Sequence, residues 1–187
     1  MQQSDFSADR VLIVIPVYNH AASLRRVVEG CLAVHSRVLV VDDGSSDEPL
    51  SRLAGLAVET LRHERNRGKG AAILSAAEQA RQWGMSHIIT IDADGQHDPA
   101  DLPRFLEQLR QTPLALVVGR RDFSVPHVPG SSRFGRRFSN FWLRVQTGRR
   151  LTDTQSGFRA YPLFLLQGIS WRQSGYAFEV EVCRIAS

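Results

Sequence analysis

The sequence predicts an α/β fold, a Rossmann-like and mostly parallel sheet flanked by helices. Short β-branched runs alternate with stretches of helical periodicity, and polar clusters follow several of the predicted strands. This alternation is typical of stacked βαβ units, whose helices cover both faces of the sheet. Ligands bind such sheets outside the carboxyl ends of the strands, so the fold class also predicts where the functional residues lie.

The predicted strands are short runs rich in β-branched residues. They span Val11–Ile15, Arg37–Asp42, Val58–His63, His87–Ile91 and Leu114–Gly119. Apolar residues between these runs recur at helical spacing. They are Leu24, Val27, Val28 and Cys31, then Ile73, Ala76, Ala77, Ala80 and Trp83, and then Leu102, Phe105, Leu106 and Leu109. We therefore expect three helices with apolar faces packed on the sheet.

Composition predicts a single domain over residues 1–187. The chain has 187 residues, of which 43% are hydrophobic and 22% are charged, enough for one ordinary core. Cys31 and Cys183 lie in apolar helical patterns, which favours buried thiols in a reducing compartment. We expect a cytoplasmic protein without a membrane span, because runs such as Val11–Val17 are far below the roughly 18 residues a span needs. Peripheral contact with the inner face of the cytoplasmic membrane is compatible with this expectation.

The formal net charge of +4 is concentrated in one segment of the chain. Eight arginines lie between Arg120 and Arg150, against the single acid Asp122. Such a segment suits the phosphates of a nucleotide or a lipid headgroup, although a solvated basic face is an equal alternative. Nothing in it resembles a basic and aromatic RNA-binding module, so we do not expect nucleic acid as a partner.

The most informative cluster is Asp92, Asp94 and Gln96, at the end of a predicted strand. Two carboxylates and an amide oxygen at alternate positions suit Mg²⁺ or Mn²⁺, which usually complete their ligand shell with substrate phosphates. The alternative is an Asp-Gly turn that caps the following helix. For Asp98 before Pro99 the helix cap is the preferred interpretation, with proline at the first helical position.

Other strand ends supply further polar residues. Asp42 and Asp43 precede a Gly-Ser turn, and carboxylates there can accept hydrogen bonds from a ribose or a base edge. A plain Asp-Gly turn is the alternative for this pair. Pro16 and Tyr18 follow the first strand and can wall the base. The stretch from Asn66 to Ala71 contains Lys69 and Gly70, and its glycines and following helix N-terminus suit an anion.

Five motifs in order along the chain carry a resemblance to a known family. They are Pro16-Val17-Tyr18-Asn19, Val41-Asp42-Asp43-Gly44-Ser45, Asn66 through Lys69-Gly70, Asp92-Ala93-Asp94-Gly95-Gln96-His97 and Ser156-Gly157-Phe158-Arg159. Together they resemble a family 2 glycosyltransferase of the dolichyl-phosphate mannose synthase type. The resemblance covers the chain from about Val11 to Glu181.

The resemblance implies a GT-A fold and an inverting glycosyltransferase of cell envelope biogenesis. The expected donor is a nucleoside diphosphate sugar, GDP-mannose or a UDP-hexose, and the expected acceptor is a polyprenyl phosphate. Asp92, Asp94 and Gln96 would hold Mg²⁺ or Mn²⁺. The residues expected to bind the donor are Pro16, Tyr18, Asp42, Asp43, Lys69, Gly70, Asp92 and Ala93.

Catalysis and acceptor binding are expected from other positions. The expected catalytic residues are Asp94, Asp153 and Arg121, where Asp153 either positions the acceptor or serves as general base. The residues expected to bind acceptor phosphate are Arg133, Arg136, Ser156 and Arg159. A sugar hydroxyl as acceptor, a haloacid-dehalogenase-like phosphotransferase and a non-catalytic nucleotide-sugar sensor are the alternatives.

The sequence departs from the family pattern at two places. His20 stands where the family usually has Glu. The chain ends soon after Phe178-Glu179, before the family's final strands, so we expect a domain truncated at its C-terminus.

Overall fold

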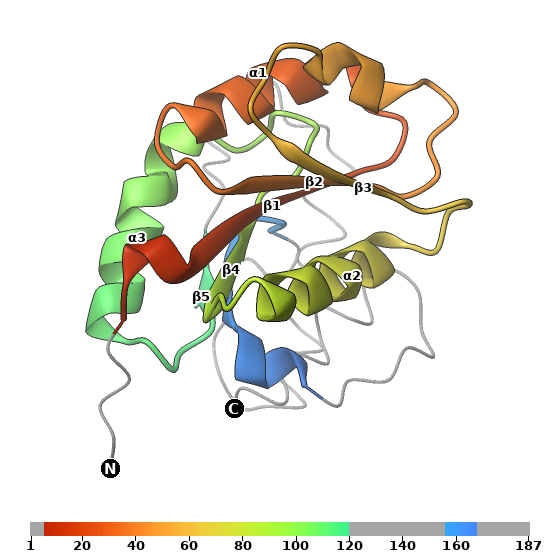
Figure 1. Cartoon of the computed structure of the whole chain (residues 1–187). Helices are drawn as coiled ribbons and strands as arrows, with labels where there is room; N and C mark the ends of the chain where they lie inside the picture. The colour runs from red at the N-terminus through yellow and green to blue at the C-terminus, as the bar shows by residue number, and fades with distance from the viewer. Residues whose placement is uncertain (1–5, 120–155, 168–187) are drawn as a thin grey trace, which may run out of the picture.

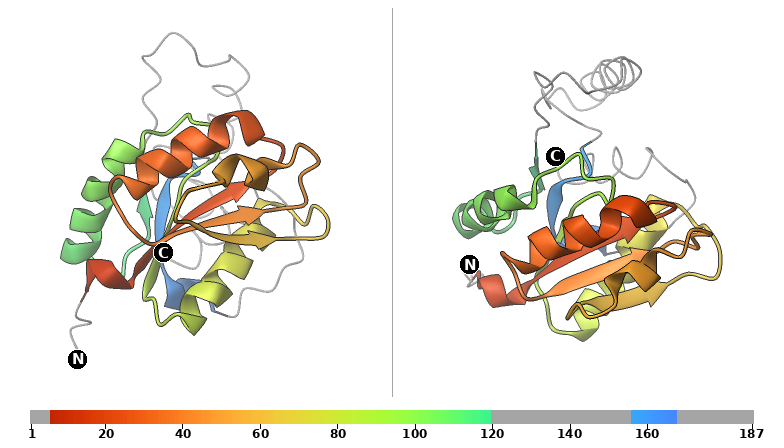
Figure 2. Two further views of the ribbon diagram at one scale, coloured as in Figure 1. Left: turned by 45° about the horizontal axis from the view of Figure 1, so that its top comes forward. Right: turned by 90° about the horizontal axis from the view of Figure 1, so that it is seen from above.

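The computed structural model describes residues 6–119 and 156–167, which form a mixed sheet packed between helices (Figure 1). In this part of the chain the sheet has six strands, in the order β3-β2-β1-β4-β6-β5. Their bounds are Val11–Val17 for β1, Val38–Asp42 for β2, Glu59–Arg62 for β3, His87–Thr90 for β4, Val117–Val118 for β5 and Arg159–Pro162 for β6. The pairs β1–β2, β1–β4 and β2–β3 are parallel, as the arrows in Figure 2 show, and β6 is antiparallel to β4 and β5.

Within the described residues, three helices connect the strands. They are α1 over Ala21–Leu32, α2 over Lys69–Gln82 and α3 over Leu102–Gln111. Shorter 3₁₀ turns span Ala8–Arg10, Pro49–Leu53, Pro99–Asp101 and Leu163–Leu166. Among the residues described, no helix combines the length and the apolar character that a bilayer crossing requires.

The core has two halves, one on each face of the sheet. Alternate residues of β1 point to opposite faces, because side chains alternate along a strand. Ile13 and Ile15 pack with α1 and α3, whereas Leu12 and Val14 pack with α2 and the turn at Leu163–Leu166. Figure 1 shows α1 and α2 on opposite sides of the sheet. The predicted alternation of strands and helices, with helices on both faces, is confirmed.

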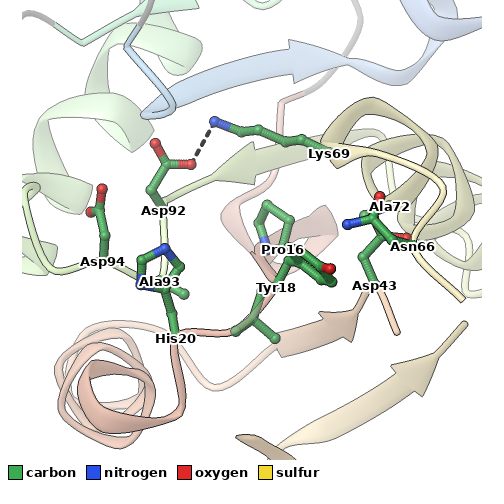
Figure 3. A pocket seen from close by; sticks show the side chains of 11 residues that line it. Pro16, Tyr18, His20, Asp43, Asn66, Lys69, Ala72, Asp92, Ala93 and Asp94 are labelled. Carbon is green, nitrogen blue, oxygen red and sulfur yellow. Dashed lines mark ion pairs between the residues drawn. The ribbon is translucent and has the colours of Figure 1, made fainter. Parts of the chain in front are cut away.

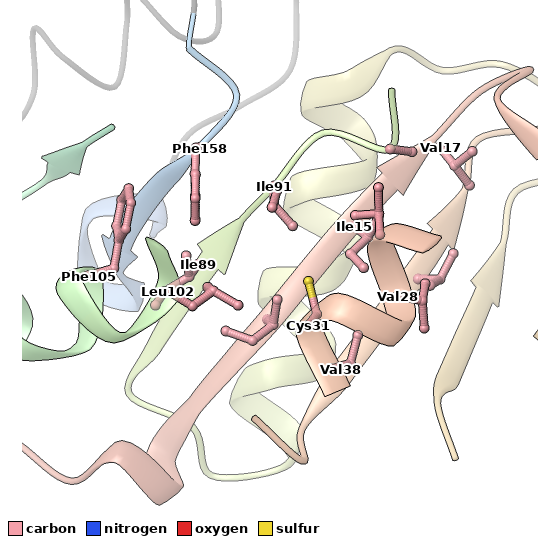
Figure 4. Packing of buried hydrophobic residues seen from close by; sticks show 14 of the residues in the cluster. Ile15, Val17, Val28, Cys31, Val38, Ile89, Ile91, Leu102, Phe105 and Phe158 are labelled. Carbon is pink, nitrogen blue, oxygen red and sulfur yellow. The ribbon is translucent and has the colours of Figure 1, made fainter. Parts of the chain in front are cut away.

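Cys31 is a small apolar residue of this core. Its side chain points from α1 toward the sheet (Figure 4) and is fully buried, and burial raises the pKa of its thiol to about 12. The predicted burial is therefore confirmed for Cys31. Cys183 lies outside the described residues.

The far edge of the sheet differs from the sequence-based expectation. The predicted strand at Leu114–Gly119 is reduced to Val117–Val118, and β6 lies between it and β4. We did not predict β6, because its four residues include Arg159 and Pro162, which are atypical of a buried strand. Arg159 is nonetheless fully buried, and its Nε donates a hydrogen bond to the carbonyl oxygen of Ser156 at 2.7 Å.

The helix cap predicted at Asp98 is confirmed. Its side chain accepts a hydrogen bond from the backbone nitrogen of Ala100 at 3.0 Å, and Pro99 occupies the first position of the turn. This turn is a 3₁₀ segment that leads into α3, so the first helical residues are more tightly wound than expected.

Gly44, after β2, is required by its surroundings as well as by its backbone angle. Its φ is 74°, and an added Cβ would meet the backbone of Arg65 and Asn66. Gly55 has a similar φ of 81° but has no atom within 4 Å of an added Cβ. An alanine at Gly55 therefore causes backbone strain alone, whereas an alanine at Gly44 causes backbone strain and a steric clash.

We predict that Gly44→Ala lowers the free energy of unfolding by about 3 kcal/mol or more, since strain and overpacking add. The matched Gly55→Ala should cost only the strain, about 1 to 2 kcal/mol. Urea unfolding of both variants measures the difference. Equal losses would show that the Arg65–Asn66 backbone moves aside without cost.

Candidate active site

A pocket of ≈ 360 Å³ opens at the carboxyl ends of β1, β2 and β4. Its lining residues are Pro16, Val17, Tyr18, His20, Asp43, Asn66, Lys69, Ala72, Asp92, Ala93 and Asp94. In Figure 3, Asp92 and Asp94 lie on one side, Asp43 and Asn66 on the other, and Pro16 and Tyr18 between them. The structure thus brings together segments that the sequence places after three different strands.

The Asp92–Asp94 turn is fixed from two sides. Ser23 of α1 donates a hydrogen bond to the carbonyl oxygen of Ala93 at 2.6 Å, and Asp94 Oδ1 accepts one from the backbone nitrogen of Gln96 at 2.9 Å. Gly157 lies against Asp92 so closely that an added Cβ would meet its carboxylate. Both aspartates line the pocket on this rigid turn.

Lys69 forms an ion pair with Asp92 inside the pocket. Its Nζ lies 2.6 Å from Asp92 Oδ1, and it is the first residue of α2 (Figure 3). The side chain reaches across the pocket from the N-terminus of the helix, where the helix dipole favours anions. Gly70, its neighbour, is buried and does not line the pocket.

Asp43 organises the opposite side of the pocket. Its Oδ1 lies 2.7 Å from His63 Nδ1 and accepts a hydrogen bond from the backbone nitrogen of Arg67 at 3.0 Å. Its Oδ2 accepts a hydrogen bond from the backbone nitrogen of Gly68 at 2.7 Å. One buried carboxylate therefore joins the end of β2, the end of β3 and the start of α2.

His63 and Ser75 lie behind Asp43, and sequence reasoning missed both. His63 Nε2 is 2.9 Å from Ser75 Oγ, so the imidazole connects Asp43 to α2. His63 is buried, with 6% of its surface exposed. The available signal was a histidine at the end of a predicted strand. The pocket-lining residues Val17, His20, Asn66 and Ala72 were also absent from the predicted site.

Asp42 requires a correction. It was expected to contact the nucleoside, but its carboxylate is fully buried and does not line the pocket. Its Oδ1 accepts a hydrogen bond from the backbone nitrogen of Ser45 at 2.9 Å. Its Oδ2 lies 3.3 Å from Arg62 Nε, an ion pair without hydrogen-bond geometry. Asp42 is the last residue of β2 and Asp43 the first residue after it, and only Asp43 lines the pocket.

The loop after β2 also supports the loop after β1. Ser45 Oγ accepts a hydrogen bond from the backbone nitrogen of Asn19 at 3.0 Å, and Asn19 Oδ1 accepts one from the backbone nitrogen of Ser46 at 2.9 Å. Asp47 Oδ2 accepts one from the backbone nitrogen of Ala21 at 2.8 Å, which satisfies a donor at the start of α1. This part of the Asp-Asp-Gly-Ser motif is therefore a scaffold for the pocket.

Three more predicted residues lie away from the pocket. Gln96 lines a separate hollow of ≈ 600 Å³ between α1 and the 3₁₀ turn at Pro99–Asp101, although its backbone nitrogen donates the hydrogen bond to Asp94 described above. Ser156 and Arg159 are fully buried, and neither lines the pocket. Their buried hydrogen bonds assign them to the support of β6.

The remaining predicted residues are not placed. Arg121, Arg133, Arg136 and Asp153, and with them the predicted basic helix, lie outside the described residues. Within residues 6–119 and 156–167, no group of three or more His, Cys, Asp and Glu side chains is arranged to hold a metal. Two carboxylates in one pocket are nevertheless what Mg²⁺ usually receives from a protein, with substrate phosphates completing the shell.

Comparison with known proteins gives a family match over most of the chain. The sequence model of Glycosyl transferase family 2 matches residues 12–168. The undecaprenyl-phosphate mannosyltransferase of Micrococcus luteus is 33% identical over 187 residues, covering 92% of this chain and 76% of that protein. The polyprenol monophosphomannose synthase of Mycolicibacterium smegmatis is 31% identical over 189 residues, covering 92% and 70%.

Solved structures share the fold. A glucosyl-3-phosphoglycerate synthase from Mycobacterium tuberculosis, in complex with Mg²⁺ and uridine diphosphate, has a TM-score of 0.69 at 20% identity, covering 92% of this chain and 63% of that chain. The same enzyme in complex with phosphoglyceric acid has a TM-score of 0.73 at 18% identity, covering 97% and 70%. The arrangement is the GT-A type expected from the sequence.

We predict that Asp43→Ala lowers the free energy of unfolding by about 3 to 5 kcal/mol, because its partners lose their buried acceptor. Asp94→Ala removes one partly exposed hydrogen bond and should cost no more than about 1 kcal/mol. Urea unfolding of the two variants provides the comparison. A fully stable Asp43→Ala would mean that water replaces the carboxylate, and an unfolded Asp94→Ala would make that residue structural.

Proposed function

We propose that this chain, which belongs to glycosyl transferase family 2, transfers a sugar from a nucleoside diphosphate to a polyprenyl phosphate. The observation that carries the proposal is one pocket at the carboxyl ends of the strands, where Asp43, Lys69, Asp92 and Asp94 converge. Two relatives, named for undecaprenyl-phosphate and polyprenol substrates, support the acceptor class. The family match leaves no support for a haloacid-dehalogenase-like phosphotransferase.

The pocket suits a divalent cation at its Asp92 side. Both aspartates line the pocket, and Asp92 already holds a positive charge there, the ammonium of Lys69 at 2.6 Å. Asp92 and Asp94 would hold Mg²⁺ or Mn²⁺ together with the donor's phosphates, without Gln96. When bound, the ion supplies positive charge that offsets the charge developing on the leaving diphosphate.

The two sides of the pocket would divide the donor between them. Asp43, fixed by three hydrogen bonds, lines the pocket beside Asn66 and can accept a hydrogen bond from the nucleoside. Pro16 and Tyr18, between the two sides, would wall the base. Lys69 and the N-terminus of α2 would meet the diphosphate, since both favour negative charge.

The proposed reaction is one displacement with inversion at the anomeric carbon. An oxygen of the acceptor phosphate forms the new bond to that carbon, and the bond to the leaving diphosphate oxygen breaks. A phosphate acceptor attacks as an anion, so no general base is needed. The arginines Arg121, Arg133 and Arg136 are proposed to bind phosphates, and their segment would contact anionic lipid at the inner face of the cytoplasmic membrane.

We predict that transfer to undecaprenyl phosphate requires Mn²⁺ or Mg²⁺, and that EDTA abolishes both transfer and tight binding of GDP or UDP. Asp94→Ala should lower turnover by about 10² to 10³ with the fold retained, because the carboxylate acts on charge formed in the transition state. Radiolabelled GDP-mannose, UDP-glucose and UDP-N-acetylglucosamine, tested in turn, identify the donor.

Asp101→Asn is the matched control for that experiment. Asp101 is an acid of the neighbouring 3₁₀ turn that pairs with Arg104 at 2.8 Å and does not line the pocket. Asp101→Asn should keep turnover within about twofold of wild type, because an exposed ion pair contributes little. Equal nucleotide affinity with and without EDTA would overturn the metal assignment.

We predict that the wild-type rate with a short polyprenyl phosphate barely depends on pH between about 6 and 8, because no proton is removed from the acceptor. Asp153→Asn should then change the acceptor KM and leave this flat profile. A rate that falls with a carboxylate-like pKa, together with a loss of about 10² to 10⁴ in Asp153→Asn, would instead indicate a sugar hydroxyl acceptor.

A further inference from the structure

Lys69 is the only lysine in the sequence, and it lies in the pocket. Lysine and arginine together number 23, and every other member of that set is an arginine. Lys69 is also the residue whose ammonium lies 2.6 Å from Asp92 Oδ1, with 32% of its side chain exposed. The one position with a compact and mobile cation is therefore the position that faces a proposed metal ligand.

The surroundings of the Asp92 carboxylate favour a positively charged partner. It shares the pocket with Asp94, another carboxylate, and Gly157 closes its other side. A carboxylate that is only 23% exposed and near a like charge is stabilised by an opposite charge in contact with it. Lys69 supplies that charge in the protein without metal.

We propose that Lys69 is an exchangeable counter-ion: it occupies Asp92 in the free protein and moves to the donor diphosphate as a divalent cation takes its place. The inference rests on the proposed function and adds a prediction about the order of binding. Asp92 Oδ1 cannot hold the ammonium and a metal at one position, and the two cations repel each other. The donor's phosphates give Lys69 an anionic partner at the N-terminus of its own helix.

The exchange makes the binding of metal and donor cooperative. This cooperativity adds to that from the direct contact between the metal ion and the donor's phosphates. A cation that arrives alone must displace Lys69 with no new anion nearby, so it binds weakly. A cation that arrives with a nucleoside diphosphate leaves Lys69 with a new partner, so it binds tightly. Because coupling between two ligands is reciprocal, the nucleotide must also bind more weakly without metal.

Lysine suits this exchange better than arginine. Its ammonium is a point charge on a flexible stem, with three donors that rotate together from one acceptor to another. A guanidinium would hold a carboxylate through two parallel hydrogen bonds and would release it less readily. A Lys69→Arg variant keeps the charge and changes only this property.

The first test measures Mn²⁺ affinity of the full chain without nucleotide, by electron paramagnetic resonance of free Mn²⁺. Lys69→Met should bind Mn²⁺ about tenfold more tightly than wild type, because one positive charge beside Asp92 is gone. Lys69→Arg should bind it no more tightly than wild type. The control is Arg26→Met, which removes a guanidinium lying against Gly95 outside the pocket and should change the affinity by less than about twofold.

The same titrations with GDP and with UDP measure the coupling. One of the two nucleotides will bind wild type more tightly. That nucleotide should raise the Mn²⁺ affinity of wild type by a larger factor than it raises the Mn²⁺ affinity of Lys69→Met. Suppose that Lys69→Met gains no Mn²⁺ affinity although wild type binds Mn²⁺ with nucleotide. The counter-ion role of Lys69 is then refuted, whereas the proposed metal-dependent glycosyltransferase function is not. If neither wild type nor any variant binds Mn²⁺, with or without nucleotide, both the counter-ion role of Lys69 and the proposed metal dependence are refuted.

A second measurement uses the wild-type side chain. Reductive methylation with ¹³C labels Lys69 as the one side-chain amine, and Asp92→Asn identifies the signal of the ammonium without the Asp92 ion pair. In the free protein the signal should differ from that of Asp92→Asn, and it should move when Mg²⁺ and nucleotide are added together but not with Mg²⁺ alone. A wild-type signal identical to that of Asp92→Asn would overturn the proposal.

Discussion

The carboxylate of Asp43 is the interaction on which the rest of the pocket depends. It receives hydrogen bonds from the backbone of Arg67 and Gly68 and contacts His63, so it fixes the loop that precedes α2. The first residue of that helix is Lys69, and its position follows from this anchor. A buried carboxylate without these partners would carry a large desolvation cost, so the loop and Asp43 stabilise each other.

Neighbouring residues of one motif have opposite roles in this protein. Asp42 is buried under the turn after β2, whereas Asp43 lines the pocket. Gln96 likewise leaves the pocket that Asp94 lines, although its backbone nitrogen holds Asp94 in place. The pocket thus presents three carboxylates, of Asp43, Asp92 and Asp94, and the ammonium of Lys69. Hydrogen bonds from other polar groups hold Asp43 and Asp94 in place, which is the preorganisation that charge stabilisation requires.

Much of the fold could be predicted because its signals are local. β1 lies between two strands and is covered on both faces, so each of its residues is apolar or proline, and α1 and α3 place an apolar stripe on one face. β6 could not be predicted in the same way. Its buried Arg159 is satisfied by the carbonyl oxygen of Ser156, and its pairing with β4 joins residues far apart in the chain.

By itself the sequence determined the order of strands and helices as far as β5, and the four acids at the ends of β2 and β4, because periodicity and turn chemistry act over a few residues. Only the tertiary structure decided which of those acids face the pocket and which cation meets them. The contact between Lys69 and Asp92 joins a helix start to a strand end through the packing of α2 on the sheet. No local pattern encodes such a distance, because it arises from how distant elements pack.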